Sequence, residues 1–121
     1  MTAFTYIPAT PEVVSRESGG LSMSTEWLSP SVVRISVVGD VDASNAADLA
    51  HYVFRRGANS QRLIIDLSAV TFFATAGFST LRTIDSRCTQ ASVSWTILTS
   101  RAVRRVLRIC DPRNSLPVTG G

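Results

Sequence analysis

The stretch DLSAVTFFATAGF, residues 66–78, links a buried strand to a helix and indicates the fold class. Residues 63–67 form a near-continuous apolar run broken only by Asp66, a pattern typical of a strand buried on both faces. A helix is predicted to begin near Thr75, and residues 71–73 are predicted to form the connecting loop. The helix is indicated by residues that share one face, namely Gly77, Leu81, Ile84 and Cys88. A strand followed by a helix is the repeating unit of an α/β sheet.

Two strands are predicted upstream of this stretch. Residues 21–27 alternate between apolar and polar side chains, and residues 32–38 are rich in β-branched side chains. One face of the first strand carries Leu21, Met23, Thr25 and Trp27. The segment 29–31, Ser-Pro-Ser, is a turn, so the two strands are expected to pair as an antiparallel hairpin. Residues 39–42, Gly-Asp-Val-Asp, are expected to end the second strand.

A helix is predicted between the second and third strands. Its apolar stripe consists of Ala46, Leu49, Ala50, Val53 and Phe54. Ser44 or Asp42 is expected to cap the first turn, because a short oxygen-bearing side chain satisfies free backbone N–H groups there. Gly57 is placed to end the helix.

The alternation of strands and helices continues to the end of the chain. Residues 93–97 alternate again and predict a strand. A last helix is indicated by Val103, Val106, Leu107 and Cys110. Asp111-Pro112 stops that helix, and residues 116–118, Leu-Pro-Val, are suited to a short edge strand.

The predicted elements indicate an α/β fold with one domain. Strands that alternate with helices imply parallel pairing through right-handed crossovers. We therefore expect a mixed, mostly parallel β-sheet with an N-terminal antiparallel hairpin and covering helices. Residues 1–20, which contain Thr, Pro and Ser and close on Gly19-Gly20, are expected to be a flexible leader to a domain spanning residues 21–121.

The composition excludes several classes of protein. The 121 residues are 45% hydrophobic and 17% charged, which suits a globular domain and not a disordered chain. No apolar stretch approaches the roughly 18 to 20 residues of a membrane span. The first nine residues lack the pattern of a secretion signal. We therefore expect a cytoplasmic protein that does not bind a membrane.

Basic residues are concentrated near the end of the chain. The net charge is +3, and all twelve basic residues are arginine. Five of them cluster late, namely Arg101, Arg104, Arg105, Arg108 and Arg113. Two interpretations stay open: a solvated helix face, or a surface for an acidic partner or a phosphate backbone. No aromatic residues interleave with these arginines, so nucleic acid is not expected as a partner.

The sequence offers no assembled catalytic or metal site. His51 is the single histidine and lies in mid-helix, where a surface or packing role is the ordinary one. The chain lacks the local motifs of nucleotide-binding loops, serine hydrolases and zinc proteases. No catalytic residue, metal or cofactor is therefore predicted, and the protein is not expected to be an enzyme.

Three segments resemble the STAS-domain anti-sigma factor antagonists. Residues 66–78 fit the family's Asp-Leu-Ser-x-Val-x-Phe pattern and the helix start that follows it. Residues 33–42 are similar to a family strand that ends in Gly-Glu-hydrophobic-Asp. Residues 105–118 are similar to its last helix and the Leu-Pro-Val after it. The segments occur in the family's order, and the resemblance covers residues 21–118.

The resemblance implies a protein-binding switch. A family member binds an anti-sigma factor, often also a serine kinase, and so releases a sigma factor. The kinase phosphorylates the hydroxyl residue that follows the motif's Asp, and binding is lost. Thr75 occupies that position here, but Ala74 stands where the family has Asp, and Thr replaces the usual Ser. Without the family's carboxylate at residue 74, recognition by a kinase and the local charge pattern are expected to differ from those of the family.

The expected contact surface lies at one edge of the predicted sheet. Because parallel strands place their carboxyl ends together, Asp40, Asp42 and Thr75 are expected at the same edge. The partner surface is expected to comprise Asp42, Ser44, Asn45, Thr75, Ala76 and Phe78. A phosphate on Thr75 would be favoured at a helix N-terminus and would bring about −1.5 to −2 charges to that surface. Alternatively, Thr75 simply caps its helix.

Other interpretations of the same residues stay open. Cys88 and Cys110 are either small buried hydrophobic residues or a disulfide pair that senses oxidants. The domain could instead be a STAS scaffold within a larger assembly, or a ligand-binding regulatory module. A monomer or weak dimer is expected for the antagonist, whereas a scaffold would form a stable oligomer.

Overall fold

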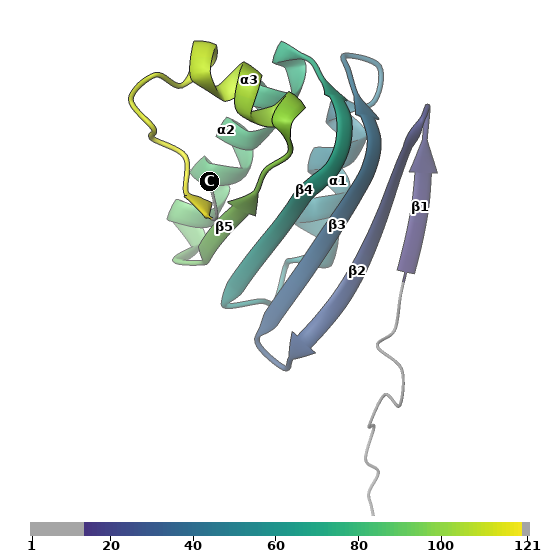
Figure 1. Ribbon diagram of the computed structural model, residues 1–121. Helices are drawn as coiled ribbons and strands as arrows, with labels where there is room; N and C mark the ends of the chain where they lie inside the picture. The colour runs from purple at the N-terminus through teal and green to yellow at the C-terminus, as the bar shows by residue number, and fades with distance from the viewer. Residues whose placement is uncertain (1–13, 120–121) are drawn as a thin grey trace, which may run out of the picture.

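The computed structural model describes residues 14–119 as one twisted sheet covered by helices, and describes side chains for residues 19–119 (Figure 1). The strands are β1 (Val14–Ser18), β2 (Leu21–Ser29), β3 (Val32–Val41), β4 (Arg62–Phe73), β5 (Ser94–Leu98) and β6 (Val118–Thr119). The helices are α1 (Ala46–Arg56), α2 (Thr75–Ala91) and α3 (Arg101–Cys110). Within the described residues, the strands lie in the sheet in chain order.

The sheet is mixed. β1, β2 and β3 pair antiparallel, whereas β3, β4, β5 and β6 pair parallel. This arrangement confirms the predicted α/β fold, the hairpin of β2 with β3, and the parallel strands after it. The short β6 follows Pro117 and pairs with β5 at the edge of the sheet.

Part of the expected leader is folded, which corrects the sequence prediction. Residues 14–18 form β1 and pair with β2, and Gly19 and Gly20 make the tight turn between the two strands. Both glycines have positive φ angles, 47° and 84°, as a two-residue hairpin turn requires. The prediction failed because residues 14–18 lack the apolar alternation that marks a strand with a buried face. Residues 1–13 lie outside the described part of the chain.

Strands β3 and β4 are both longer than predicted. The Gly39–Asp42 segment does not end β3, which runs through a bulge to Val41, and residues 71–73 belong to β4 and not to a loop. Gly39 has a φ angle of 111°, and a Cβ atom there would collide with the carbonyl oxygen of Gly20. The glycine therefore keeps the bulge close to the β1–β2 turn.

The main part of the core lies between the sheet and the helices α1 and α2; in Figure 1, α1 lies behind β3 and β4, and α2 lies behind α3 and β5. Val103 and Leu107 of α3 also belong to the core. Alternate residues of each strand face α1 and α2. The largest fully buried side chains on the sheet are those of Leu21, Met23, Val33, Ile35, Val37, Val41, Ile65, Leu67 and Ile97. Trp27, which continues this pattern along β2, is instead 38% exposed because a bulge interrupts the strand pairing beside it.

The helices follow the predicted apolar stripes. α1 ends at Gly57, whose N–H donates to the carbonyl of Val53, and α3 begins at Ser100, whose hydroxyl accepts from the N–H of Val103. The chain leaves α3 at Asp111, whose buried carboxylate accepts hydrogen bonds from Ser115 and from the N–H of Leu116. This turn leads the chain back to β6. In the described part of the chain, no helix is long and apolar enough to cross a bilayer.

Candidate partner-binding surface

The loop after β3 and the start of α2 lie side by side at the carboxyl edge of the sheet. The N–H of Ala74 donates to the carbonyl of Val41 at 2.8 Å, which joins the two segments directly. Asp40 is still within β3, and its carboxylate accepts from the hydroxyl of Thr71 on β4 at 2.9 Å. Asp40, Asp42 and Thr75 therefore share one edge, as the parallel strands predicted.

The acidic part of this edge is a charged turn. One carboxylate oxygen of Asp42 accepts from both the hydroxyl and the N–H of Ser44, at 2.5 and 2.9 Å. These hydrogen bonds lower the pKa of Asp42 from its ordinary value, so the side chain stays ionised at neutral pH. Ser44 is exposed and Asp42 is partly exposed, so the turn offers a fixed negative charge to an approaching molecule.

Asn45 holds the turn in place and is not available for contact. It is fully buried. Its Oδ1 accepts from the N–H of Asp42 at 2.9 Å, and its Nδ2 donates to the carbonyls of Asp40 and Gly19 at 2.9 and 3.2 Å. The expectation that Asn45 contacts a partner is therefore corrected. Asn45 is also the residue at the N-cap of α1, the position predicted for Ser44 or Asp42, and it makes no side-chain capping bond.

Thr75 lies at the exposed start of α2. The N-cap of this helix is Ala74, so Thr75 is its first helical residue and does not serve as the cap. Within residues 19–119, no side-chain hydrogen bond involves the Thr75 hydroxyl, and the side chain is exposed. The helix begins close to the sheet because residue 77 is glycine: a Cβ there would lie 2.5 Å from the Phe73 ring.

The apolar part of the edge includes residues that the sequence patterns did not single out. Ala76 and Phe78 are half-buried and pack against the core, and the Arg82 guanidinium lies 5.8 Å from the centre of the Phe78 ring. Phe72 is 53% exposed and Val38 is 52% exposed. Phe72 was expected in a loop and instead belongs to β4, past the bulges that shift the register between β3 and β4. Val38 continues the outward side of the alternation along β3, which could have identified it as an exposed apolar residue.

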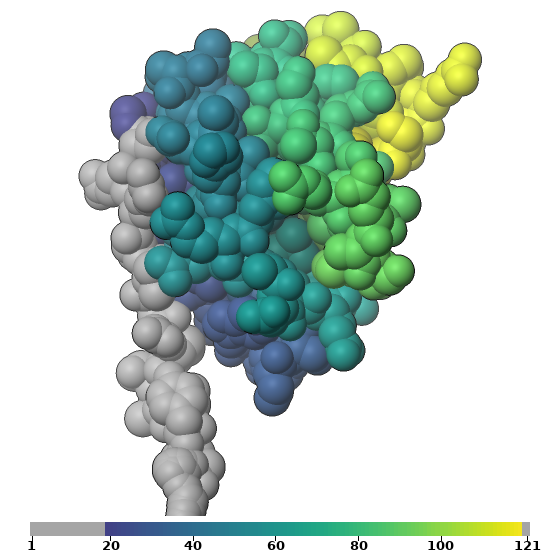
Figure 2. Space-filling model, turned by 180° about the vertical axis from the view of Figure 1, so that it is seen from behind, coloured from purple at the N-terminus to yellow at the C-terminus, as the bar shows by residue number. Residues whose placement is uncertain are grey.

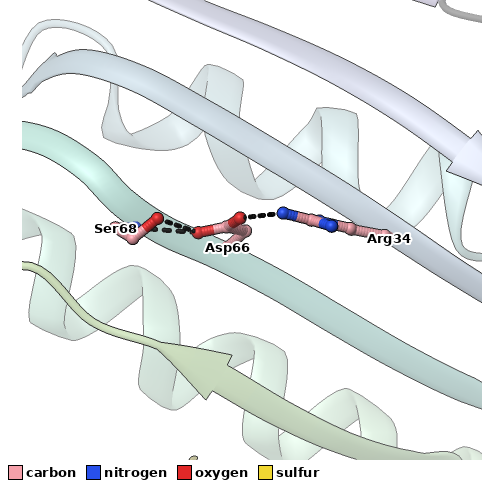
Figure 3. A network of polar contacts seen from close by, with 3 residues as sticks. All are labelled: Arg34, Asp66 and Ser68. Carbon is pink, nitrogen blue, oxygen red and sulfur yellow. Dashed lines mark hydrogen bonds and ion pairs between the residues drawn. The ribbon is translucent and has the colours of Figure 1, made fainter. Parts of the chain in front are cut away.

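The motif residue Asp66 has a structural partner across the sheet, on the face opposite α1 and α2 (Figure 3). One of its carboxylate oxygens accepts from Arg34 of β3 at 2.5 Å, and the other accepts from the hydroxyl and N–H of Ser68 at 2.5 and 2.9 Å. Burial opposes ionisation of Asp66, but the Ser68 hydrogen bonds and the Arg34 charge outweigh it and lower the pKa. The motif's Asp-Leu-Ser therefore fixes β4 against β3.

Four of the five clustered arginines lie together. Arg101, Arg104, Arg105 and Arg108 are exposed on α3 and line one hollow of about 300 Å³. Arg113 lies in the loop after α3 and does not line this hollow. The cluster borders the carboxyl edge, because Arg101 and Arg105 also line a hollow with Thr71.

Both cysteines are free thiols. Cys88 lies on the buried face of α2, and burial, reinforced by the nearby charge of Asp85, raises the pKa of its thiol to about 11. Cys110 is half-buried at the end of α3. A thiol that stays protonated is a poor nucleophile for disulfide exchange, so Cys88 behaves as a small core residue.

Figure 2 shows the face covered by α1 and α2, where an apolar hollow of about 250 Å³ opens between their C-terminal halves. It lies at the opposite end of these helices from Thr75. Val53, Ile84 and Cys88 contribute to its lining. Arg87 also lines it, with its guanidinium 4.3 Å from the centre of the Phe54 ring. This hollow could receive an apolar group, but it does not offer the polar lining that a nucleotide needs.

The described part of the chain contains no group of three or more His, Cys, Asp or Glu side chains that could hold a metal ion. His51 is exposed on α1. Apart from Thr75, the polar side chains at the carboxyl edge bond to each other and to backbone groups. Their arrangement suits recognition of another molecule.

Comparison with known proteins agrees with these observations. The STAS domain model matches residues 28–119. The chain belongs to the STAS domain family.

Two solved structures share the STAS fold of this chain. An anti-sigma factor antagonist from Mycobacterium paratuberculosis superposes with a TM-score of 0.67 over 97% of this chain and 92% of that chain, at 20% identity. The unphosphorylated anti-sigma factor antagonist SpoIIAA superposes with a TM-score of 0.58 over 73% of this chain and 79% of that chain, at 15% identity.

A curated relative extends beyond the matched region. Osmosensory protein A of Mycobacterium tuberculosis (strain ATCC 25618 / H37Rv) is 32% identical over 69 residues, which are 57% of this chain and 44% of that protein. The match thus spans less than half the length of this relative.

Proposed function

We propose that this STAS domain is an anti-sigma factor antagonist. It binds an anti-sigma factor through the carboxyl edge of the sheet, and the sigma factor is thereby released. The contact surface consists of Asp42, Ser44, Thr75, Ala76 and Phe78, with Asn45 holding the turn beneath it. The observation that carries the proposal is the hydrogen bond from Ala74 to Val41, which brings the charged turn and the start of α2 into one surface.

We further propose that phosphorylation of Thr75 ends this binding. The Thr75 side chain is exposed, and its hydroxyl does not cap the helix because Ala74 is the N-cap residue. A phosphate there is favoured by the free N–H groups of the helix N-terminus. It would also share the sheet edge with the ionised Asp42, so an uncharged side chain would become one with about −1.5 to −2 charges on a surface that already carries a negative charge. A partner that fits the unmodified surface would then be repelled.

The first prediction tests both parts of this proposal by capture of partners from a lysate of the source organism. Wild type and Thr75→Ala should capture an anti-sigma factor, whereas Thr75→Glu should lose about tenfold or more in affinity, because it adds a charge at the contact. Ser79→Glu is the matched control: it adds the same charge on the same helix, one turn further from the edge. Purified partner and isothermal titration then give the affinities.

Each possible result separates the two parts of the proposal. Equal capture by wild type, Thr75→Glu and Ser79→Glu would contradict the phosphorylation switch and leave the antagonist function standing. No anti-sigma factor with any bait would contradict the antagonist function itself. A stable oligomer on size-exclusion chromatography, without such a partner, would favour the scaffold interpretation.

A further inference from the structure

Four arginines of α3 form a positive strip that is not neutralised within the molecule. Arg101, Arg104, Arg105 and Arg108 recur at spacings of three and four residues, so their side chains lie along one face of the helix. All four are exposed. Within residues 19–119, none of them forms an ion pair, and the described polar contact is a bond of 3.4 Å from Arg104 to the Thr99 hydroxyl.

This arrangement is unfavourable for the isolated helix. Like charges three or four residues apart on a helix repel one another. Arg101 and Arg104 also lie in the first turn, where the helix dipole disfavours cations, and no acidic residue lies there to compensate. An anion bound across the strip therefore lowers the free energy, because it reduces the repulsion among the arginines. The dipole at the N-terminus of α3 also favours an anion there.

The position of the strip indicates what kind of anion it meets. Arg101 and Arg105 border Thr71, whose hydroxyl donates to Asp40 at the carboxyl edge. The strip thus borders the same edge of the sheet that carries the proposed contact surface. A nucleic-acid duplex laid along the strip and this edge would bring phosphates against the negative charges of Asp40 and Asp42. A short acidic segment of polypeptide can follow the strip without meeting them.

We propose that the α3 strip is a second contact surface that binds an acidic segment of the protein partner. Planar guanidinium groups pair with carboxylates in a bidentate manner, which suits a chain of Asp and Glu side chains. The assignment of that segment to an anti-sigma factor rests on the proposed function above. The affinity of the strip for an acidic polypeptide does not, and it can be measured without the partner.

The second prediction uses a fluorescein-labelled peptide of alternating Glu and Ser residues, ten residues long, as the probe. Fluorescence anisotropy at low salt should show binding to the wild type that weakens as salt rises. Arg104→Gln/Arg108→Gln should bind about tenfold more weakly. The control Arg55→Gln/Arg62→Gln removes the same charge from exposed positions outside the strip and should bind within about twofold of wild type.

A further variant separates binding from folding. Arg104→Glu creates opposite-charge pairs with Arg101 and Arg108, three and four residues away, so it should raise the thermal midpoint while it abolishes peptide binding. Equal losses in the two double variants would overturn the proposal, because attraction would then depend on net charge alone. Tighter binding of a labelled 20-base-pair DNA duplex, or of phosphatidylserine vesicles, than of the peptide through the same arginines would also overturn it.

The probe and capture experiments together distinguish a failure of the α3 strip proposal from a failure of the anti-sigma factor proposal. If the probe binds the strip but no anti-sigma factor is captured, the acidic surface belongs to another protein partner. If an anti-sigma factor is captured equally by wild type and Arg104→Gln/Arg108→Gln, and the probe fails to bind, the strip is a solvated helix face and the second contact is wrong.

Discussion

Residues of similar chemical type in this domain differ in whether they are exposed to solvent or buried. Asn45 and Asp42 are three positions apart, yet one is buried with its hydrogen bonds directed to backbone groups and the other carries an exposed charge. Thr75 is exposed, whereas Cys88, one of the chain's two thiols, is buried. Chemistry at this scale depends on solvent access as much as on residue type.

The third prediction concerns the two thiols. In the folded protein at pH 8, Ellman's reagent should label Cys110 first, because burial and a pKa of about 11 leave Cys88 with about a hundredfold less thiolate than an ordinary cysteine. Cys88→Ser and Cys110→Ser assign each rate. Equal rates, or a loss of 2 Da after mild oxidation of the wild type, would revive the disulfide hypothesis.

At the scale of elements, the contact surface depends on β3 and β4 continuing past the points where their sequences suggest an end. The bulges at Gly39 and near Thr71 let both strands reach the carboxyl edge with altered register. Phe72, which follows these bulges, is exposed, and Val41 accepts a hydrogen bond from Ala74. The positions of the residues at the carboxyl edge thus depend on bulges in β3 and β4, which no local sequence pattern predicts.

The fourth prediction tests the bulge at Gly39. Gly39→Ala should destabilise the fold by about 3 kcal/mol or more, because a Cβ would be forced into positive φ and against the Gly20 carbonyl. Gly20→Ala is the matched control: its φ is 84° but its Cβ would meet open space, so about 1 kcal/mol is expected. Urea unfolding measures both. Equal losses would show that close backbone approach is not what requires Gly39.

At the scale of the whole molecule, stability depends on pH through the polar network of the open sheet face. The folded state lowers the pKa of Asp66 below its unfolded value, so it binds fewer protons at that site than the unfolded chain. The resulting stabilisation is fully present above about pH 4, the unfolded pKa, and is lost as pH falls through the lower folded pKa. Acid therefore weakens the link between β3 and β4.

The fifth prediction follows from this sign. Asp66→Asn should lose about 1–2 kcal/mol of unfolding free energy at pH 7, and the difference from wild type should shrink as the pH falls from 5 to 2. Arg34→Gln should keep most of the pH dependence, because the Ser68 hydrogen bonds lower the pKa of Asp66 more than Arg34 does. Urea unfolding at each pH measures the effect. A difference that does not change with pH would contradict it.

The sequence by itself determined the α/β class, the order of elements from β2 onward and the apolar faces of the helices. These follow from periodicity, because a stripe such as Leu81, Ile84 and Cys88 can be buried only on one side of a helix. It also determined that Asp42 and Thr75 share an edge, because parallel strands end on the same side. Three segments in the family's order, residues 33–42, 66–78 and 105–118, pointed to the STAS family.

Only the tertiary structure decided which of these residues face outward. β1 escaped prediction because a polar edge strand carries no buried alternation, and the Gly19-Gly20 turn appears in the sequence as the end of a leader. Asn45 was expected on the surface but is buried, because its side chain bonds to backbone groups of Asp40 and Asp42 and to the carbonyl of Gly19, 26 residues away in the chain. Exposure and register are set by contacts between residues far apart in the chain, and local patterns do not encode them.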